Sequence, residues 1–176
     1  MRIVTLGVAL VLLSGCAATP PVEPTPPIST SVETIPRDGV EELAITAVTN
    51  YFRTSAVVAA DGGADPDRIA HVVTARWLPN EIAGFATLGE LGTRQVGAPT
   101  ITKIEATSIR GIAAVSEVVV HVCTALDGVA VVSDDFGEDL TPDGTTLVSV
   151  FVVPEDGVMK VDGVQPWADS TWCLAP

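Results

Sequence analysis

The sequence predicts an α+β domain in which about three N-terminal helices pack on a curved antiparallel sheet. Two observations support this prediction. Apolar residues recur every three to four positions as far as residue 91, which is typical of amphipathic helices, and every second position after Gly97, which is typical of strands. The helical segments come first and the strands follow, an order that favours α+β over a parallel α/β arrangement.

Three segments carry the helical pattern. The first covers residues 39–59, where Asp38 begins a capping box and apolar or small residues then form one continuous stripe. The second begins at Asp65-Pro66, because proline is favoured in the first turn of a helix. After Pro79 and Asn80, residues 81–91 predict a third, short helix. The side chains that we expect the second helix to bury are Ile69, Val72, Val73, Arg76 and Trp77.

Four strands are expected in the second half of the chain. The last two meet at Asp156-Gly157, a favoured two-residue hairpin turn. The stretch from Asp127 to Gly144 is rich in acidic side chains but lacks the alternating oxygen ligands of a calcium loop, so we expect a solvated loop there. The expected strands cover residues 100–110, 112–126, 145–153 and 158–164. Along the second strand, Val118, Val120 and Val122 share one face, and Val119, His121 and Cys123 share the other.

The N-terminal region is organised like an export signal followed by a tether. Arg2 precedes an apolar run from Ile3 to Leu13, and this run is shorter than the roughly 20 residues that a membrane-spanning helix needs. The following stretch is rich in proline, which predicts an extended spacer of roughly 3 Å per residue. We therefore expect a signal peptide over residues 1–15, a disordered tether over 16–37 and a single domain over 38–176.

Leu13-Ser14-Gly15-Cys16 resembles the lipobox of bacterial lipoproteins. The resemblance implies that the Cys16 thiol receives a diacylglyceryl group and that Cys16 becomes the mature N-terminus. The protein would then be anchored by lipid to the extracytoplasmic face of the cell membrane. An ordinary signal peptide that happens to contain a cysteine is the alternative.

Two further cysteines, Cys123 and Cys173, remain once Cys16 is assigned to the lipid. In an oxidising compartment we expect them to form a structural disulfide. A metal pair or a redox couple is the alternative, but neither cysteine has a CxxC partner and metal sites usually need more thiols or histidines nearby.

The chain is strongly acidic, with a formal net charge of −13. This balance argues against nucleic acid as a partner, because nucleic-acid binding depends on lysine and arginine contacts to phosphates. It also disfavours contact between the domain and an anionic membrane surface. We therefore expect the lipid on Cys16 to be the membrane contact.

The order of the elements resembles that of the NTF2-like, or SnoaL-like, superfamily, in particular small secreted lipoproteins of actinobacteria. The resemblance covers about residues 40–173 and depends on AVTNYFRTSAVV, DPDRIAHVV, the four-strand meander and the closing VDGVQPWADSTWC. In this superfamily the sheet wraps around the first helix and leaves a pocket at the open end of a cone, which serves catalysis, ligand binding or packing alone. A cystatin-like fold, which lacks the second and third helices, is the alternative.

Two functional hypotheses follow from this resemblance. The first is a non-enzymatic binding or assembly module of the cell envelope, whose partner is an envelope protein or a small apolar ligand. The second is a SnoaL-like lyase or isomerase that acts on a small apolar ligand through Tyr51 and His121. No catalytic motif of the family is present, so we assign no catalytic residue, and we expect neither a metal nor a cofactor. The candidate pocket residues are Tyr51, Trp77, Phe85, His121, Phe151 and Trp167.

Overall fold

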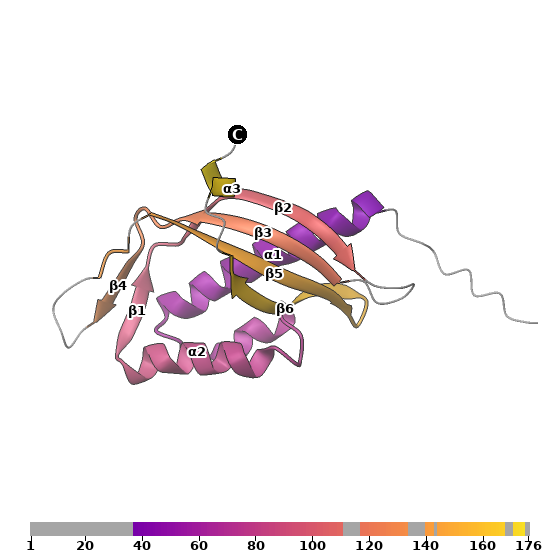
Figure 1. Ribbon diagram of the computed structural model, residues 1–176. Helices are drawn as coiled ribbons and strands as arrows, with labels where there is room; N and C mark the ends of the chain where they lie inside the picture. Colours follow the sequence, from indigo (N-terminus) through magenta and orange to yellow (C-terminus); the bar gives the residue numbers. More distant parts are fainter. Residues whose placement is uncertain (1–36, 111–116, 134–139, 143, 168–170, 175–176) are drawn as a thin grey trace, which may run out of the picture. The chain divides into compact units, whose positions relative to one another are not determined.

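A long helix, α1 (Arg37–Ala60), lies across one face of a curved antiparallel sheet in the computed structural model of the protein (Figure 1). The structure describes residues 37–110, 117–133, 140–142, 144–167 and 171–174. A second helix, α2 (Leu78–Glu90), packs against α1 and the segment between them. The predicted α+β class, with helices on a curved antiparallel sheet, is therefore confirmed. The predictions for the signal peptide, Cys16 and the tether fall outside the described residues.

The main sheet is a four-stranded antiparallel meander in the order β2-β3-β5-β6. Its members are β2 (Thr100–Arg110), β3 (Glu117–Ala125), β5 (Thr145–Glu155) and β6 (Val158–Pro166). Asp156 and Gly157 both have positive φ, 53° and 81°, as a two-residue turn of type I′ requires. The hairpin turn that the sequence predicts is thus the turn between β5 and β6. The first part of the expected second strand, residues 112–116, lies outside the described residues.

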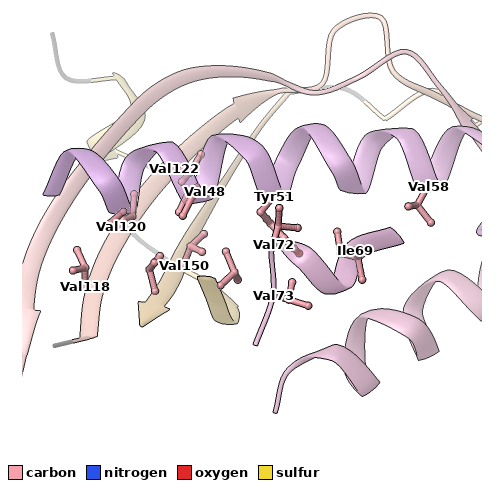
Figure 2. Packing of buried hydrophobic residues seen from close by; sticks show 14 of the residues in the cluster. Val48, Tyr51, Val58, Ile69, Val72, Val73, Val118, Val120, Val122 and Val150 are labelled. Carbon is pink, nitrogen blue, oxygen red and sulfur yellow. The ribbon is translucent and has the colours of Figure 1, made fainter. Parts of the chain in front are cut away.

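The core fills the space between α1 and one face of this sheet (Figure 2). Val120 of β3 lies opposite Val150 of β5 in the strand register, and both are fully buried. Tyr51 enters the same core from α1 and is 8% exposed. Neighbouring residues of a strand point to opposite faces, so His121, which follows Val120, lies on the face of the sheet away from α1.

The second helix differs from the prediction. Only a 3-10 turn, η1 (Pro66–His71), forms after Asp65, which adopts a left-handed conformation and caps nothing with its side chain. Val73 instead makes a parallel bridge to Val161 at the edge of β6, so the chain is already extended there. Pairing with the sheet edge therefore prevents the helix that the spacing of apolar residues predicts. Arg76, which was expected to be buried, is exposed.

The starts of α1 and α2 also differ from the prediction. Helix α1 begins at Arg37, so Asp38 lies inside the helix and is not its N-cap. Helix α2 begins at Leu78, and Pro79 occupies its first turn instead of interrupting the chain. Proline fits there because the first amides of a helix have no intrahelical acceptor.

A small second sheet was not expected. Strand β1 (Thr93–Val96) pairs antiparallel with β4 (Ala130–Ser133), which lies within the stretch predicted to be an acidic loop. The loop that follows β1 at Gly97 and the loop that precedes β4 at Gly128 lie close together. A Cβ on Gly97 would lie 2.1 Å from the carbonyl oxygen of Gly128, and Gly97 has a positive φ. Glycine at position 97 therefore permits this close approach.

The C-terminal segment returns to the outer face of the sheet. Cys173, in the short helix α3 (Thr171–Leu174), forms a disulfide with Cys123 in β3, with Cα atoms 5.8 Å apart. Cys123 is fully buried. This bond fastens the chain end to the middle of the sheet, on the side opposite α1. Among the described helices, none combines the length and apolar character needed to cross a membrane.

Candidate functional site

A pocket of about 290 Å³ lies between α1 and α2 and is bordered on one side by Gln95 of β1 and by Pro99. The helices supply one wall each because Tyr51 and Ser55 are one turn apart on α1, and Glu81 and Phe85 are one turn apart on α2. Most of the side chains that line the pocket are apolar and a few are polar, as is typical of ligand pockets. The lining residues are Tyr51, Phe52, Ser55, Ala56, Ala59, Glu81, Phe85, Gln95 and Pro99.

The Glu81 carboxylate is the polar centre of this pocket. Tyr51 donates its hydroxyl hydrogen to Glu81 Oε1 over 3.0 Å, and the indole N–H of Trp77 donates to the same oxygen over 2.7 Å. Burial raises the pKa of Tyr51 well above its usual value, and the negative charge of Glu81 raises it further. Tyr51 therefore stays protonated as a donor and is poorly suited to act as a general base.

Ser55 places a second hydroxyl beside Tyr51. Its Oγ atom is buried and closed to solvent. Hydrogen bonding from Ser55 lowers the pKa of Tyr51, against the larger effect of burial. Ser55 therefore belongs with the polar groups around Tyr51.

A longer apolar groove of about 480 Å³ adjoins the pocket along α1. The two share Phe52, Ala56 and Pro99. The groove continues along the exposed side of the helix, where Val57 is 50% exposed. Pocket and groove together form a site that is polar at one end and apolar at the other. The groove is lined by Thr49, Phe52, Arg53, Ala56, Val57, Ala60, Gly97, Ala98, Pro99 and Ile101.

The six candidate pocket residues do not share one cavity. Tyr51 and Phe85 line the pocket beside α1, and Trp77 reaches it through Glu81. Phe151 lies in a smaller cavity of about 240 Å³ at the edge of β6, which Trp77 also lines. His121 and Trp167 are on the outer face. The common lining proposed from the sequence is therefore wrong, because alternation along β3 places His121 on the face away from α1, where Trp167 stacks against it.

The outer face carries an aromatic cluster beneath the C-terminal segment. The rings of His121 and Trp167 stack with centroids 3.8 Å apart, and Trp172 meets His121 edge-on. The Ser149 hydroxyl lies 3.0 Å from Nδ1 of His121, and Lys103 lies over the Trp172 ring. Burial lowers the pKa of His121, partly offset by the nearby carboxylate of Glu105. The imidazole of His121 is therefore surrounded by side chains that pack against it.

Tyr51 and His121 therefore cannot act on one ligand, since the sheet separates them. The lyase or isomerase hypothesis uses both groups, and the structure does not bring them together. His71, the other histidine, is exposed and its Nδ1 lies 2.7 Å from the carbonyl oxygen of Arg68. In the part of the chain that the structure describes, no three potential metal ligands gather into one cluster.

An ion pair lies at the edge of the sheet, in the wall of the smaller cavity. Arg76 binds the carboxylate of Asp162, which also accepts a hydrogen bond from the Thr74 hydroxyl over 2.5 Å. Hydrogen bonding from Arg76 holds the pKa of Asp162 below its usual value. Because these groups satisfy one another, we assign them a structural role at this edge.

Sequence reasoning missed Ser55 and Glu81. Ser55 stands one turn after Tyr51, and Glu81 stands one turn before Phe85, so each shares a helix face with a residue that was identified. That spacing was the available signal. The meeting of the two faces was not predictable, because it depends on how α2 packs against α1.

Comparisons with known proteins inform the fold alone. The sequence matches no protein-family model and no curated protein. The structure is similar to the crystal structure of the intermembrane space region of chloroplast protein ARC6, with a TM-score of 0.58 and 14% sequence identity. The match covers 73% of this chain and 97% of the ARC6 region. At this identity the likeness extends to the fold and to nothing more specific.

Proposed function

We propose that this protein is a lipid-anchored, non-enzymatic binding module on the extracytoplasmic face of the cell membrane, and that it holds a small apolar molecule along α1. The apolar groove of about 480 Å³ next to the pocket between the helices carries this proposal. Its volume falls within the range of roughly 300–1,000 Å³ that is common for small-molecule sites. In this proposal Cys16 carries the lipid, and the tether is the stretch from there to the start of α1 at Arg37.

We also propose that the domain belongs to the NTF2-like superfamily. Two features support this assignment: the curved sheet packed against α1, and a cavity beside that helix. A binding role is favoured over a lyase or isomerase role because Tyr51 is a tightly held donor and His121 lies beyond the sheet. An envelope protein is the other partner class, but the volume and the mainly apolar lining of the groove favour a small molecule.

A titration followed by NMR tests the binding role. We expect octyl methyl ether to shift the backbone amide signals of groove residues, and Ala56→Phe to abolish these shifts by filling the groove. Ala86→Phe is the matched control, because Ala86 is an exposed alanine of α2 that lines neither cavity. Equal shifts in both variants, or none in the unmodified protein, would contradict the proposal.

Anchoring is tested separately by Cys16→Ser. Without the thiol no diacylglyceryl group can be attached, so we expect the variant to remain unprocessed or unlipidated when the membrane fraction is analysed by mass spectrometry. A processed form that stays anchored despite this substitution would show that the lipobox reading is wrong.

A further inference from the structure

We propose that the apolar groove along α1 holds an anionic amphiphile, a single alkyl chain whose carboxylate or phosphate head group binds the guanidinium of Arg53. This inference rests on the proposed binding function and adds the chemical class of the ligand. Two observations carry it. Among the described residues that line the groove, Arg53 is the one with a charged side chain, and the cavity on its other side is lined by further basic side chains.

The groove follows one stripe of α1. Its helical members recur three and four positions apart, so they share one side of the helix. From Arg53 to Ala60 the stripe runs for about 10 Å along the helix axis, at 1.5 Å per residue. The side chains that follow Arg53 along this stripe are all apolar: Ala56, Val57 and Ala60. An alkyl chain gains free energy by leaving water for such a surface.

Arg53 is the group in this lining that can bind a polar head. The hydroxyl of Thr49, the other polar side chain of the stripe, donates to the carbonyl oxygen of Ile45. A guanidinium has five N–H donors and no acceptor. Arg53 gives one of them to Oδ1 of Asn50 over 3.2 Å, and no carboxylate of the described residues pairs with it. The remaining donors can therefore bind a ligand that supplies acceptor oxygens.

The charges around Arg53 favour an anion. A cavity of about 380 Å³ shares Arg53 and Val57 with the groove and adds Arg68 and His71. Among the described residues that line the groove or this cavity, none is acidic, although the chain as a whole has a formal net charge of −13. Arg68 is already paired with Asp61 over 2.7 Å. Arg53 is thus the arginine of this surface that is left to pair with a ligand.

Other head groups fit this arrangement less well. An ammonium group would face the positive charge of Arg53 and has no acceptor for its N–H groups. An ether or an alcohol would accept a hydrogen bond but brings no opposite charge. A carboxylate or a phosphate supplies both the charge and two oxygens for parallel hydrogen bonds, the geometry that a guanidinium favours.

The direction of the bound chain follows from the same helix. The carboxyl end of α1 carries the negative end of the helix dipole, and its last turn contains no basic residue. An anionic head group is therefore disfavoured at Ala60 and favoured at Arg53. The tail then extends from Arg53 toward the carboxyl end of α1.

The experiment compares octanoate and octyl phosphate with octyl methyl ether, which is uncharged. Affinities are measured at low ionic strength by NMR titration of the intact domain and of two variants. Arg53 is exposed, so its ion pair with a ligand is partly screened by water. We expect Arg53→Gln to weaken the binding of both anions about three- to fivefold and to leave the affinity for the ether unchanged.

Arg94→Gln is the matched control, because Arg94 is an exposed arginine of β1 that lines neither the groove nor the cavity beside it. Both substitutions change the net charge of the domain by the same amount. We expect Arg94→Gln to leave all three affinities unchanged. Neither substitution should lower the melting temperature, since both side chains are exposed.

The outcomes separate this inference from the function that it rests on. If the ether binds, but Arg53→Gln weakens neither anion or Arg94→Gln weakens both equally, the head-group assignment is wrong while the binding role stands. Tighter binding of octylammonium than of octanoate would also overturn the assignment. If Arg53→Gln weakens both anions, the assignment holds, and the anion that binds more tightly distinguishes a carboxylate from a phosphate ligand. If no octyl compound binds, both proposals fail.

Discussion

Replacing Cys173 with serine should destabilise the domain by about 4 kcal/mol. The disulfide joins residues that are 50 positions apart in the chain, from β3 to α3. In the chain-entropy model a closed loop of this length restricts the unfolded chain by about 4 kcal/mol at 25 °C. Cys173 is the better position to change, because Cys123 is fully buried and its side chain should stay in place.

The assay is urea unfolding of a chain that starts at residue 35, where the compact unit begins. With an m value of about 2 kcal/mol/M, the loss corresponds to a midpoint lower by ~2 M. Unfolding of the unmodified chain under a thiol reductant should give a similar shift. A midpoint change below about 0.5 M would refute the reasoning, since it would mean that the bond does not restrict the unfolded chain.

Two further predictions concern the walls of the site. Gly63→Ala should destabilise the domain in thermal unfolding, because Gly63 has a positive φ and an added Cβ would lie 2.1 Å from the carbonyl oxygen of Phe85, whereas Gly84→Ala in the open middle of α2 should stabilise it by about 1 kcal/mol. An unchanged melting temperature in Gly63→Ala would contradict the close packing of Gly63 against Phe85. Tyr51 is the sole tyrosine, so ultraviolet titration reports on it alone, and we expect no phenolate signal near pH 10 until the domain unfolds. Ionisation near pH 10 with native circular dichroism would show that the phenol is not buried.

The sequence predicted the elements that depend on local patterns. Alternation in β3 placed Val118, Val120 and Val122 on one face, and the Asp156-Gly157 pair marked the turn between β5 and β6. Both are decided by residues close together in the chain. The first helix was placed within two residues of its observed start for the same reason.

The errors came from contacts between distant segments. Val72 and Val73 had helical spacing, but the edge of β6 draws them into an extended conformation through the Val161 N–H, which donates to the Val72 carbonyl. Strand β4 pairs with β1, more than 30 positions earlier in the chain. The spacing of apolar residues within one segment carries no information about such partners.

The candidate site was predictable in part for the same reason. Tyr51 and Phe85 were identified as large amphipathic or apolar residues on helix faces, and both line the pocket. His121 was assigned to the same pocket because its strand face could not be related to α1 without the sheet. Ser55 was missed because a serine on a helix gives no signal until the packing of α2 against α1 places it in one pocket with Tyr51 and Glu81.

The most direct test of the central claim is to locate a bound octyl chain by intermolecular NOEs in the complex of the domain with octyl methyl ether. The account predicts contacts from the octyl chain to Ala56, Val57 and Ala60 of the groove. Contacts to Trp167 and Trp172 on the outer face, or no intermolecular contacts at saturating octyl methyl ether, would contradict it.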